Sequence, residues 1–157
     1  QILVNNAGVM DNFEPVAEVS NSQWDRIMNV NLRGPFMLMR LLIPHFLHHK
    51  HGNIINISSI GGLQGARAGA AYTASKFAMN GLTKNTGDLY ADSGLRCNSV
   101  APGAIETNIG NSIDYSKVSA EMKKNSILTD GEVAEGLILT CQAHPTSAEI
   151  YVDFDDV

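Results

Sequence analysis

The six residues "NIINIS" (53–58) decide how the chain folds. The run is short and rich in isoleucine, and a Gly-rich stretch, "SIGGLQGARAG" (59–69), follows it directly. A brief apolar run bounded by turn residues is typical of a strand buried in a parallel sheet. Neighbouring parallel strands are joined by crossover segments that are usually helices. We therefore expect helices on both sides of this run along the chain.

Two further strand-like runs flank the first, "ILV" (2–4) and "LRCNSV" (95–100). Apolar residues recur at helical spacing between them, first after a cap at Asn21 or Ser22 and again after Pro35, with "RGPF" (33–36) expected to interrupt the two helices. A long helix is predicted over about 70–91. Its apolar stripe comprises Ala71, Ala74, Ala78, Leu82 and Leu89, flanked by Tyr72 and Lys76.

Strands alternating with helices predict an α/β fold, a doubly wound parallel sheet of Rossmann-like type. Ligands of such sheets bind beyond the carboxyl ends of the strands. Three polar or Gly-rich loops directly follow the strands: "NNAG" (5–8), "SSIGG" (58–62) and "APGAIET" (101–107). We expect them to converge on one edge and to form the site.

Composition excludes several classes of function. The 157 residues carry a formal net charge of −5, with no basic cluster for nucleic acid and no apolar run of the ~20 residues that span a membrane. Cys97 and Cys141 make neither a disulfide framework nor a zinc site, and a reducing, cytoplasmic location is the expectation. His45 and His49 have the i, i+4 spacing of a metal pair but no further ligand, so no metal site is predicted.

The segment "YTASK" (72–76) places a phenol and an ammonium group one helical turn apart with small residues between them. One interpretation is a surface pair that contributes a few tenths of a kcal/mol. The other is a catalytic phenol. A free phenol has a pKa near 10, and a nearby cation would lower that pKa so that the group exchanges protons near neutral pH. The rest of the sequence favours the second interpretation.

Five segments in order, "LVNNAG", "NVNLRG", "INISS", "AYTASK" and "APGAIET", carry a resemblance to a known family, with Ser59 thirteen residues before Tyr72. The chain resembles the short-chain dehydrogenase/reductase family from residue 2 to about 109. More narrowly, it is similar to the YxxxK branch of this family, which includes 3-oxoacyl-carrier-protein reductases and glucose 1-dehydrogenase-like enzymes. The resemblance implies an oxidoreductase that uses NAD or NADP to interconvert a small secondary alcohol and a ketone.

The resemblance also implies a role for each catalytic residue. Tyr72 would be the general acid/base, and Lys76 would bind the nicotinamide ribose and hold its charge near the phenol. Ser59, rather than Ser58, would hydrogen-bond the substrate oxygen, and Asn31 would hold a relay water. Simpler roles remain open: Asn31 as a helix-terminus cap and the serines as partners of loop backbone.

The cofactor residues follow in the same way. Those implied to line the nicotinamide half, besides Tyr72 and Lys76, are Asn6, Ala7, Gly8, Pro102, Gly103, Ile105 and Thr107. A rigid turn alone would also explain Gly8, Pro102 and Gly103. Asn5 is expected to be structural and to join adjacent strands.

The sequence departs from the family at both ends. It lacks the Gly-rich turn "TGxxxGxG" that binds the pyrophosphate, and it ends in "TSAEIYVDFDDV" instead of a Gly-containing strand and loop. We therefore interpret residues 1–157 as one partial domain, the catalytic half, with roughly 80 residues missing before it. The alternative is a non-catalytic remnant. Helices are expected over about 112–125 and 130–141 and a strand in "AEIYVDF" (148–154). A homodimer or homotetramer is expected for the full-length protein.

Overall fold

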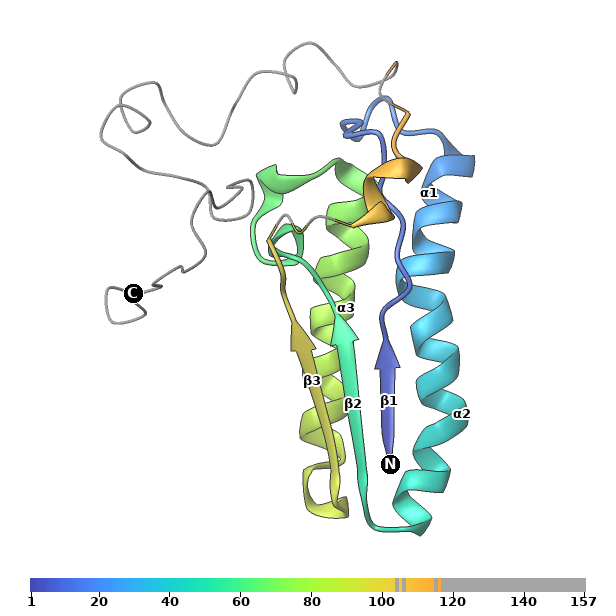
Figure 1. Ribbon diagram of the computed structural model, residues 1–157, viewed down its shortest axis with the longest axis vertical. Helices are drawn as coiled ribbons and strands as arrows, with labels where there is room; N and C mark the ends of the chain where they lie inside the picture. Colours follow the sequence, from blue (N-terminus) through green and yellow to red (C-terminus); the bar gives the residue numbers. More distant parts are fainter. Residues whose placement is uncertain (104, 106, 115, 117–157) are drawn as a thin grey trace, which may run out of the picture.

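A computed structural model describes residues 1–103, 105, 107–114 and 116 of the chain. Its centre is a parallel three-stranded sheet in the order β1 (Ile2–Asn5), β2 (Gly52–Ile57) and β3 (Leu95–Val100), as Figure 1 shows. Residue Ile54 of β2 lies opposite Leu3 of β1 and Cys97 of β3. The predicted α/β class and parallel sheet are confirmed.

Helices form the crossovers between these strands. The first connection contains α1 (Asn21–Met28), the π-helical turn η1 (Asn29–Arg33) and α2 (Gly34–His48), and the second contains α3 (Ala70–Leu89). Short 3₁₀ turns are Ile60–Gly62, Gly65–Arg67, Ala91–Ser93 and Asn108–Ser112. In the described part of the chain, no helix is long and apolar enough to cross a membrane.

The core lies between the sheet and the helices α2 and α3. Its buried side chains are Met39, Ile43, Phe46, Ile54 and Leu95, with Leu82 and Tyr90 of the second crossover packed against them. The opposite face of the sheet leaves apolar side chains in solvent, including Ile2, Val4 and Val100. Among the described residues, helices thus cover one face of the sheet, and the second layer expected of a doubly wound sheet is not among them.

Two predictions about the first crossover were wrong. The segment "RGPF" does not interrupt it, because the chain continues from α1 through η1 into α2, where Pro35 sits in the first turn. The wider π turn accommodates an extra residue without ending the helix. The cap is Ser20 rather than Asn21 or Ser22, since the Ser20 hydroxyl accepts a hydrogen bond from the backbone N–H of Gln23 at 3.2 Å.

The buried face of α3 also differs from the predicted alanine stripe. Tyr72 and Lys76 lie on the buried face itself, together with Ala71, Ser75, Met79, Asn80, Thr83 and Thr86, whereas Leu89 is exposed. Four of the polar side chains on this face have hydrogen-bond partners in the first crossover, in β2 or in the loop after it, or within α3 itself: Ser75, Lys76, Asn80 and Thr83. The helices predicted over 112–125 and 130–141 and the last strand lie outside the described residues.

Candidate active site

The carboxyl ends of the three strands meet at one edge of the sheet, at the end where α3 begins (Figure 1). The backbone N–H of Ser58, just after β2, donates to the carbonyl of Val100 at 2.8 Å, and that of Ile60 donates to the carbonyl of Pro102 at 2.9 Å. The loop after β1 approaches the same place, because a Cβ atom on Gly8 would lie 3.6 Å from the Lys76 ammonium nitrogen. The three predicted loops therefore converge.

Tyr72 and Lys76 lie in the first two turns of α3 and point inward. Their side chains are only 5% and 3% exposed, and the Lys76 Nζ atom lies 5.4 Å from the centre of the Tyr72 ring. Nζ donates a hydrogen bond of 2.8 Å to the carbonyl of Ile57, the last residue of β2. Burial of the ammonium group lowers the pKa of Lys76 from 10.5 to about 8. A surface pair, the simpler interpretation of "YTASK", does not fit this burial.

The pKa of Tyr72 is raised, which corrects the expectation that the adjacent lysine would lower it. Burial is the largest cause because it disfavours the phenolate. A hydrogen bond with the Ser59 side chain lowers the pKa, and the negative charge of Asp11 raises it again. In the protein without a bound nucleotide, these contributions keep Tyr72 a protonated phenol at neutral pH.

Ser59 and Ser58 have separate environments. Ser59 and the Tyr72 ring both lie close to Gly61, since a Cβ atom on this glycine would be 3.4 Å from the Ser59 hydroxyl oxygen and 3.5 Å from the ring. The Ser58 hydroxyl is buried and donates to the backbone carbonyl of Lys76 at 3.3 Å. Ser59 is thus the serine beside the phenol, while Ser58 fastens β2 to α3.

Asn31 lies in the π turn η1 and is 1% exposed. Its side-chain oxygen accepts a hydrogen bond from the Val9 N–H at 2.9 Å, and its amide nitrogen donates to the Val9 carbonyl at 3.0 Å and to the Ser75 hydroxyl at 3.1 Å. Ser75 in turn donates to the Tyr72 carbonyl at 2.7 Å. The side chain of Asn31 thus joins the loop after β1 to α3, and a relay water at this residue stays a prediction.

The residues expected near a nicotinamide ring are spread along the edge. Asn6 and Ala7 are exposed, while Gly8 lies against Asn31 and Lys76. The carbonyl of Pro102 is bound by the loop after β2, Gly103 and Ile105 are exposed, and the Thr107 hydroxyl accepts from the Ile109 N–H at 3.3 Å. Their contacts with a nucleotide stay predictions.

The family follows from comparison with known proteins. The family profile described as short chain dehydrogenase matches residues 1–117. The chain belongs to the short-chain dehydrogenase family. A 3beta-hydroxysteroid dehydrogenase 2 of Eggerthella lenta is 50% identical over 110 residues, which are 69% of this chain and 42% of that protein. A short-chain dehydrogenase/reductase of Penicillium canescens is 47% identical over 119 residues, 76% of this chain and 46% of the relative.

Solved structures agree with this assignment. A 4-hydroxyisoleucine dehydrogenase complexed with NADH matches with a TM-score of 0.62 and 38% identity, covering 67% of this chain and 46% of the other. A 3-ketoacyl-(acyl-carrier-protein) reductase of Brucella melitensis complexed with NADH gives a TM-score of 0.67 and 32% identity, with 72% and 48% covered. This short-chain dehydrogenase chain spans about half the length of the relatives it matches.

Sequence reasoning missed Asp11 and Ser75 in this short-chain dehydrogenase site. Both side chains are fully buried, and both hold the turn of α3 that carries Tyr72. Ser75 could have been suspected, because it lies three residues after Tyr72 on the same helical face. Asp11 gives no such signal, since the two N–H groups of α3 and its cap that it binds belong to residues 58 and 61 positions away in the sequence.

Other candidate sites lie apart from this edge. In the described part of the chain, no group of three or more His, Cys, Asp or Glu side chains could hold a metal ion. The rings of His45 and His49 stack with centroids 4.4 Å apart at the end of α2. Burial raises the pKa of Cys97 to about 11, so this thiol is not reactive at neutral pH.

Proposed function

We propose that the protein containing this chain is an NAD- or NADP-dependent oxidoreductase that interconverts a secondary alcohol and a ketone. The observation that carries the proposal is a buried, protonated Tyr72 beside the Ser59 hydroxyl, with the Lys76 ammonium group 5.4 Å from its ring. Family membership and the NADH complexes of similar structures support the same chemistry. We place the protein within the YxxxK branch on the segment "YTASK".

The residues around Gly8 fit the ribose end of a nicotinamide nucleotide. Gly8 has no side chain, so its backbone lies close to the Lys76 ammonium nitrogen, which would be 3.6 Å from a Cβ atom at this position. Among the described residues, Lys76 uses one of its three N–H donors, on the Ile57 carbonyl, which leaves two for ribose hydroxyls. When bound, the nucleotide supplies or accepts the hydride. Asn6, Ala7, Pro102, Gly103, Ile105 and Thr107 would complete the nicotinamide side of this site.

The protonation state of Tyr72 defines its part in the reaction. As a neutral phenol it can donate a proton to the carbonyl oxygen of a ketone while Ser59 donates a hydrogen bond to the same oxygen. The Lys76 cation then stabilises the phenolate that remains. Asn31 contributes by holding the loop after β1 against α3, so that Gly8 and Lys76 keep their spacing. In the reverse direction the same phenolate accepts the alcohol proton.

A binding measurement followed by turnover tests the proposal. Reduced nicotinamide nucleotides are titrated into the intact protein and into its Tyr72→Phe variant, and their fluorescence is followed. Both proteins are expected to bind the nucleotide, and only the first to oxidise secondary alcohols. The alcohol panel should include a 3β-hydroxysteroid and 4-hydroxyisoleucine, which are named for two relatives. A folded protein that binds no nucleotide would support the alternative of a non-catalytic remnant.

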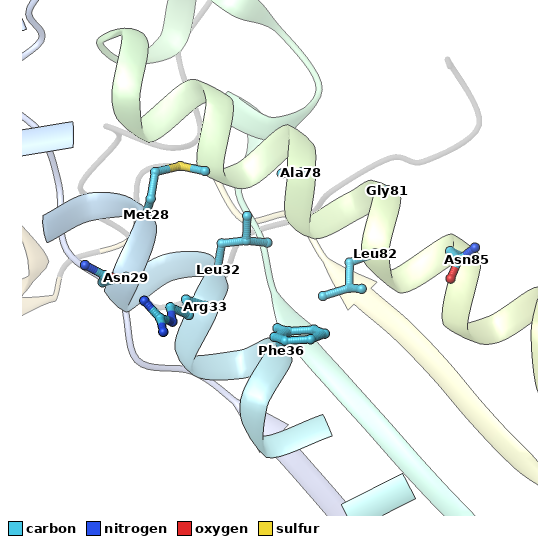
Figure 2. A pocket seen from close by; sticks show the side chains of 9 residues that line it. All are labelled: Met28, Asn29, Leu32, Arg33, Phe36, Ala78, Gly81, Leu82 and Asn85. Carbon is cyan, nitrogen blue, oxygen red and sulfur yellow. The ribbon is translucent and has the colours of Figure 1, made fainter. Parts of the chain in front are cut away.

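We also infer that the protein associates with a second copy of itself through α1, α2 and α3. An apolar groove of about 540 Å³ lies on the outer side of these helices, lined by Met28, Leu32, Phe36, Ala78, Leu82 and their neighbours (Figure 2). None of the candidate catalytic residues lines it. Phe36 is 41% exposed at its rim, and burial against an identical helix pair would cover it. Sedimentation of a Phe36→Asp variant is expected to show a monomer, and an unchanged oligomer would refute the inference.

A further inference from the structure

Asp11 connects the loop after β1 to the start of α3. Its side chain is fully buried. One carboxylate oxygen accepts a hydrogen bond from the Tyr72 N–H at 2.8 Å, and the other accepts from the N–H groups of Gly69 and Phe13, both at 3.1 Å. Four consecutive N–H groups at a helix start have no partner within the helix, and a carboxylate there satisfies them and favours the helix dipole. Asp11 is therefore the cap of α3, supplied from a distant segment.

The contact between Asp11 and the helix start is close-packed. The N-cap position is Gly69, which has no side chain to cap the helix. A Cβ atom on Gly69 would lie 2.6 Å from the Asp11 carboxylate and 2.7 Å from the Glu14 backbone nitrogen. The next N–H, of Ala70, donates to the Glu14 carbonyl at 2.9 Å. The segment from Asp11 to Glu14 thus takes the place of an ordinary side-chain cap and packs against the first turn of α3, which carries Tyr72.

The same segment also contributes to the packing of the cluster that contains Tyr72. Phe13 adopts a φ of 58°, which is uncommon for a residue other than glycine, and its N–H is held by Asp11. In this conformation Phe13 packs against the buried cluster that contains Tyr72. Tyr72 is therefore held in two places. The Asp11 carboxylate binds its backbone N–H, and the buried cluster packs around its side chain.

We propose that Asp11 is a positioning residue for the acid/base tyrosine: its buried carboxylate caps the turn that presents the phenol and holds the Tyr72 backbone N–H. This inference rests on the proposed function for its catalytic consequence. Burial is the largest cause of the raised pKa of Tyr72, and the negative charge of Asp11 raises this pKa further. A cation such as Lys76 favours the phenolate instead. Among the described residues, the charged groups shown near Tyr72 are Asp11 from the loop after β1 and Lys76 from α3, while Ser59 from the loop after β2 is neutral. Glu14 meets the start of α3 through its backbone.

The test uses the intact protein with tyrosine carrying ¹³C at the ring carbon that bears the hydroxyl. The resonance of Tyr72 is identified by its loss in Tyr72→Phe, and its titration is followed by NMR in Asp11→Asn. The control is Ser20→Ala, which removes the cap of α1 instead. Both variants are expected to lower the free energy of unfolding, Asp11→Asn because the amide keeps only one of the two accepting oxygens. Only Asp11→Asn should move the Tyr72 titration to lower pH. Hydrogen exchange at the Tyr72 amide should accelerate by about fivefold or more, as for the loss of one cap of about 1 kcal/mol.

Each outcome decides the inference. A Tyr72 titration that stays where it is in Asp11→Asn, with both cap variants equally destabilised, would show that Asp11 is structural only. If Asp11→Asn does not fold, Asp11→Ser is used, because serine is neutral and still caps. In turnover assays the pH profile of kcat should move together with the NMR titration. If Tyr72→Phe keeps its activity, the proposed function fails, while the NMR arm still decides whether Asp11 controls the phenol.

Discussion

Lys76→Met should stabilise the nucleotide-free protein at neutral pH while removing its activity. Burial lowers the pKa of Lys76 from 10.5 to about 8, and each unit corresponds to about 1.36 kcal/mol, so the buried ammonium group costs the folded state about 3 kcal/mol below pH 8. Methionine removes this cost but also the hydrogen bond to the Ile57 carbonyl, which contributes about 1 kcal/mol. The expected net gain is about 2 kcal/mol.

The sign of this effect depends on pH. Because the folded-state pKa is lowered, the unfolded chain binds the extra proton between about pH 8 and pH 10.5, and the wild-type protein gains stability as the pH rises through that window. The advantage of Lys76→Met should therefore disappear by pH 10.5. Urea unfolding at several pH values measures it, with Lys84→Met on the exposed side of α3 as the matched control. A variant equally destabilised at neutral and alkaline pH would refute the reasoning.

Two further predictions concern packing around the site. Gly69→Ala should destabilise the protein by about 1–3 kcal/mol, because the new Cβ atom would lie 2.6 Å from the Asp11 carboxylate. Thermal unfolding measures the loss. Gly65→Ala is the control, since a Cβ atom there has no neighbour within 4 Å. Asn5→Ala should cost about 1–3 kcal/mol in urea unfolding, since it leaves the buried side-chain oxygen of Asn56 without its 2.7 Å partner. An Asn5→Ala variant as stable as wild type would remove the argument that this pair joins β1 to β2.

The sequence was sufficient for the fold class and for the loops that meet at one edge of the sheet. Short apolar strands at 2–4, 53–58 and 95–100 appear within one or two residues of their predicted bounds, because their isoleucines and valines fit only a sheet that packs on helices. The Asn5 side chain joins adjacent strands through Asn56, as expected. The loops after the strands converge because parallel strands end at one edge.

Prediction failed where tertiary contacts override local pattern. The stripe of alanines on α3 looked like the buried face by hydrophobicity alone, but Lys76, Asn80 and Thr83 are buried in its place because each finds a hydrogen-bond partner. The sequence at 29–33 has an ordinary helical pattern and gives no sign of the π turn that the structure contains there. Its consequence is that Asn31 points at Val9 and Ser75, a contact that no spacing rule reveals.

The pKa of Tyr72 could not be predicted from the sequence for a similar reason, because it depends on tertiary contacts. The sequence reveals the cation at position 76 but neither the depth of burial nor the carboxylate of Asp11, and both of these raise the pKa that the cation was expected to lower. An i, i+4 pair alone therefore predicts which two groups lie close together but not the direction in which the pKa of the phenol moves.

Turnover by Tyr72→Phe tests the central claim most directly, that the buried phenol of this site carries the proton. The variant lacks only the hydroxyl group, so nucleotide affinity should stay within about threefold of wild type while kcat falls by at least about 100-fold, the usual contribution of a general acid. Retention of more than about a tenth of the wild-type kcat would contradict the assignment of Tyr72.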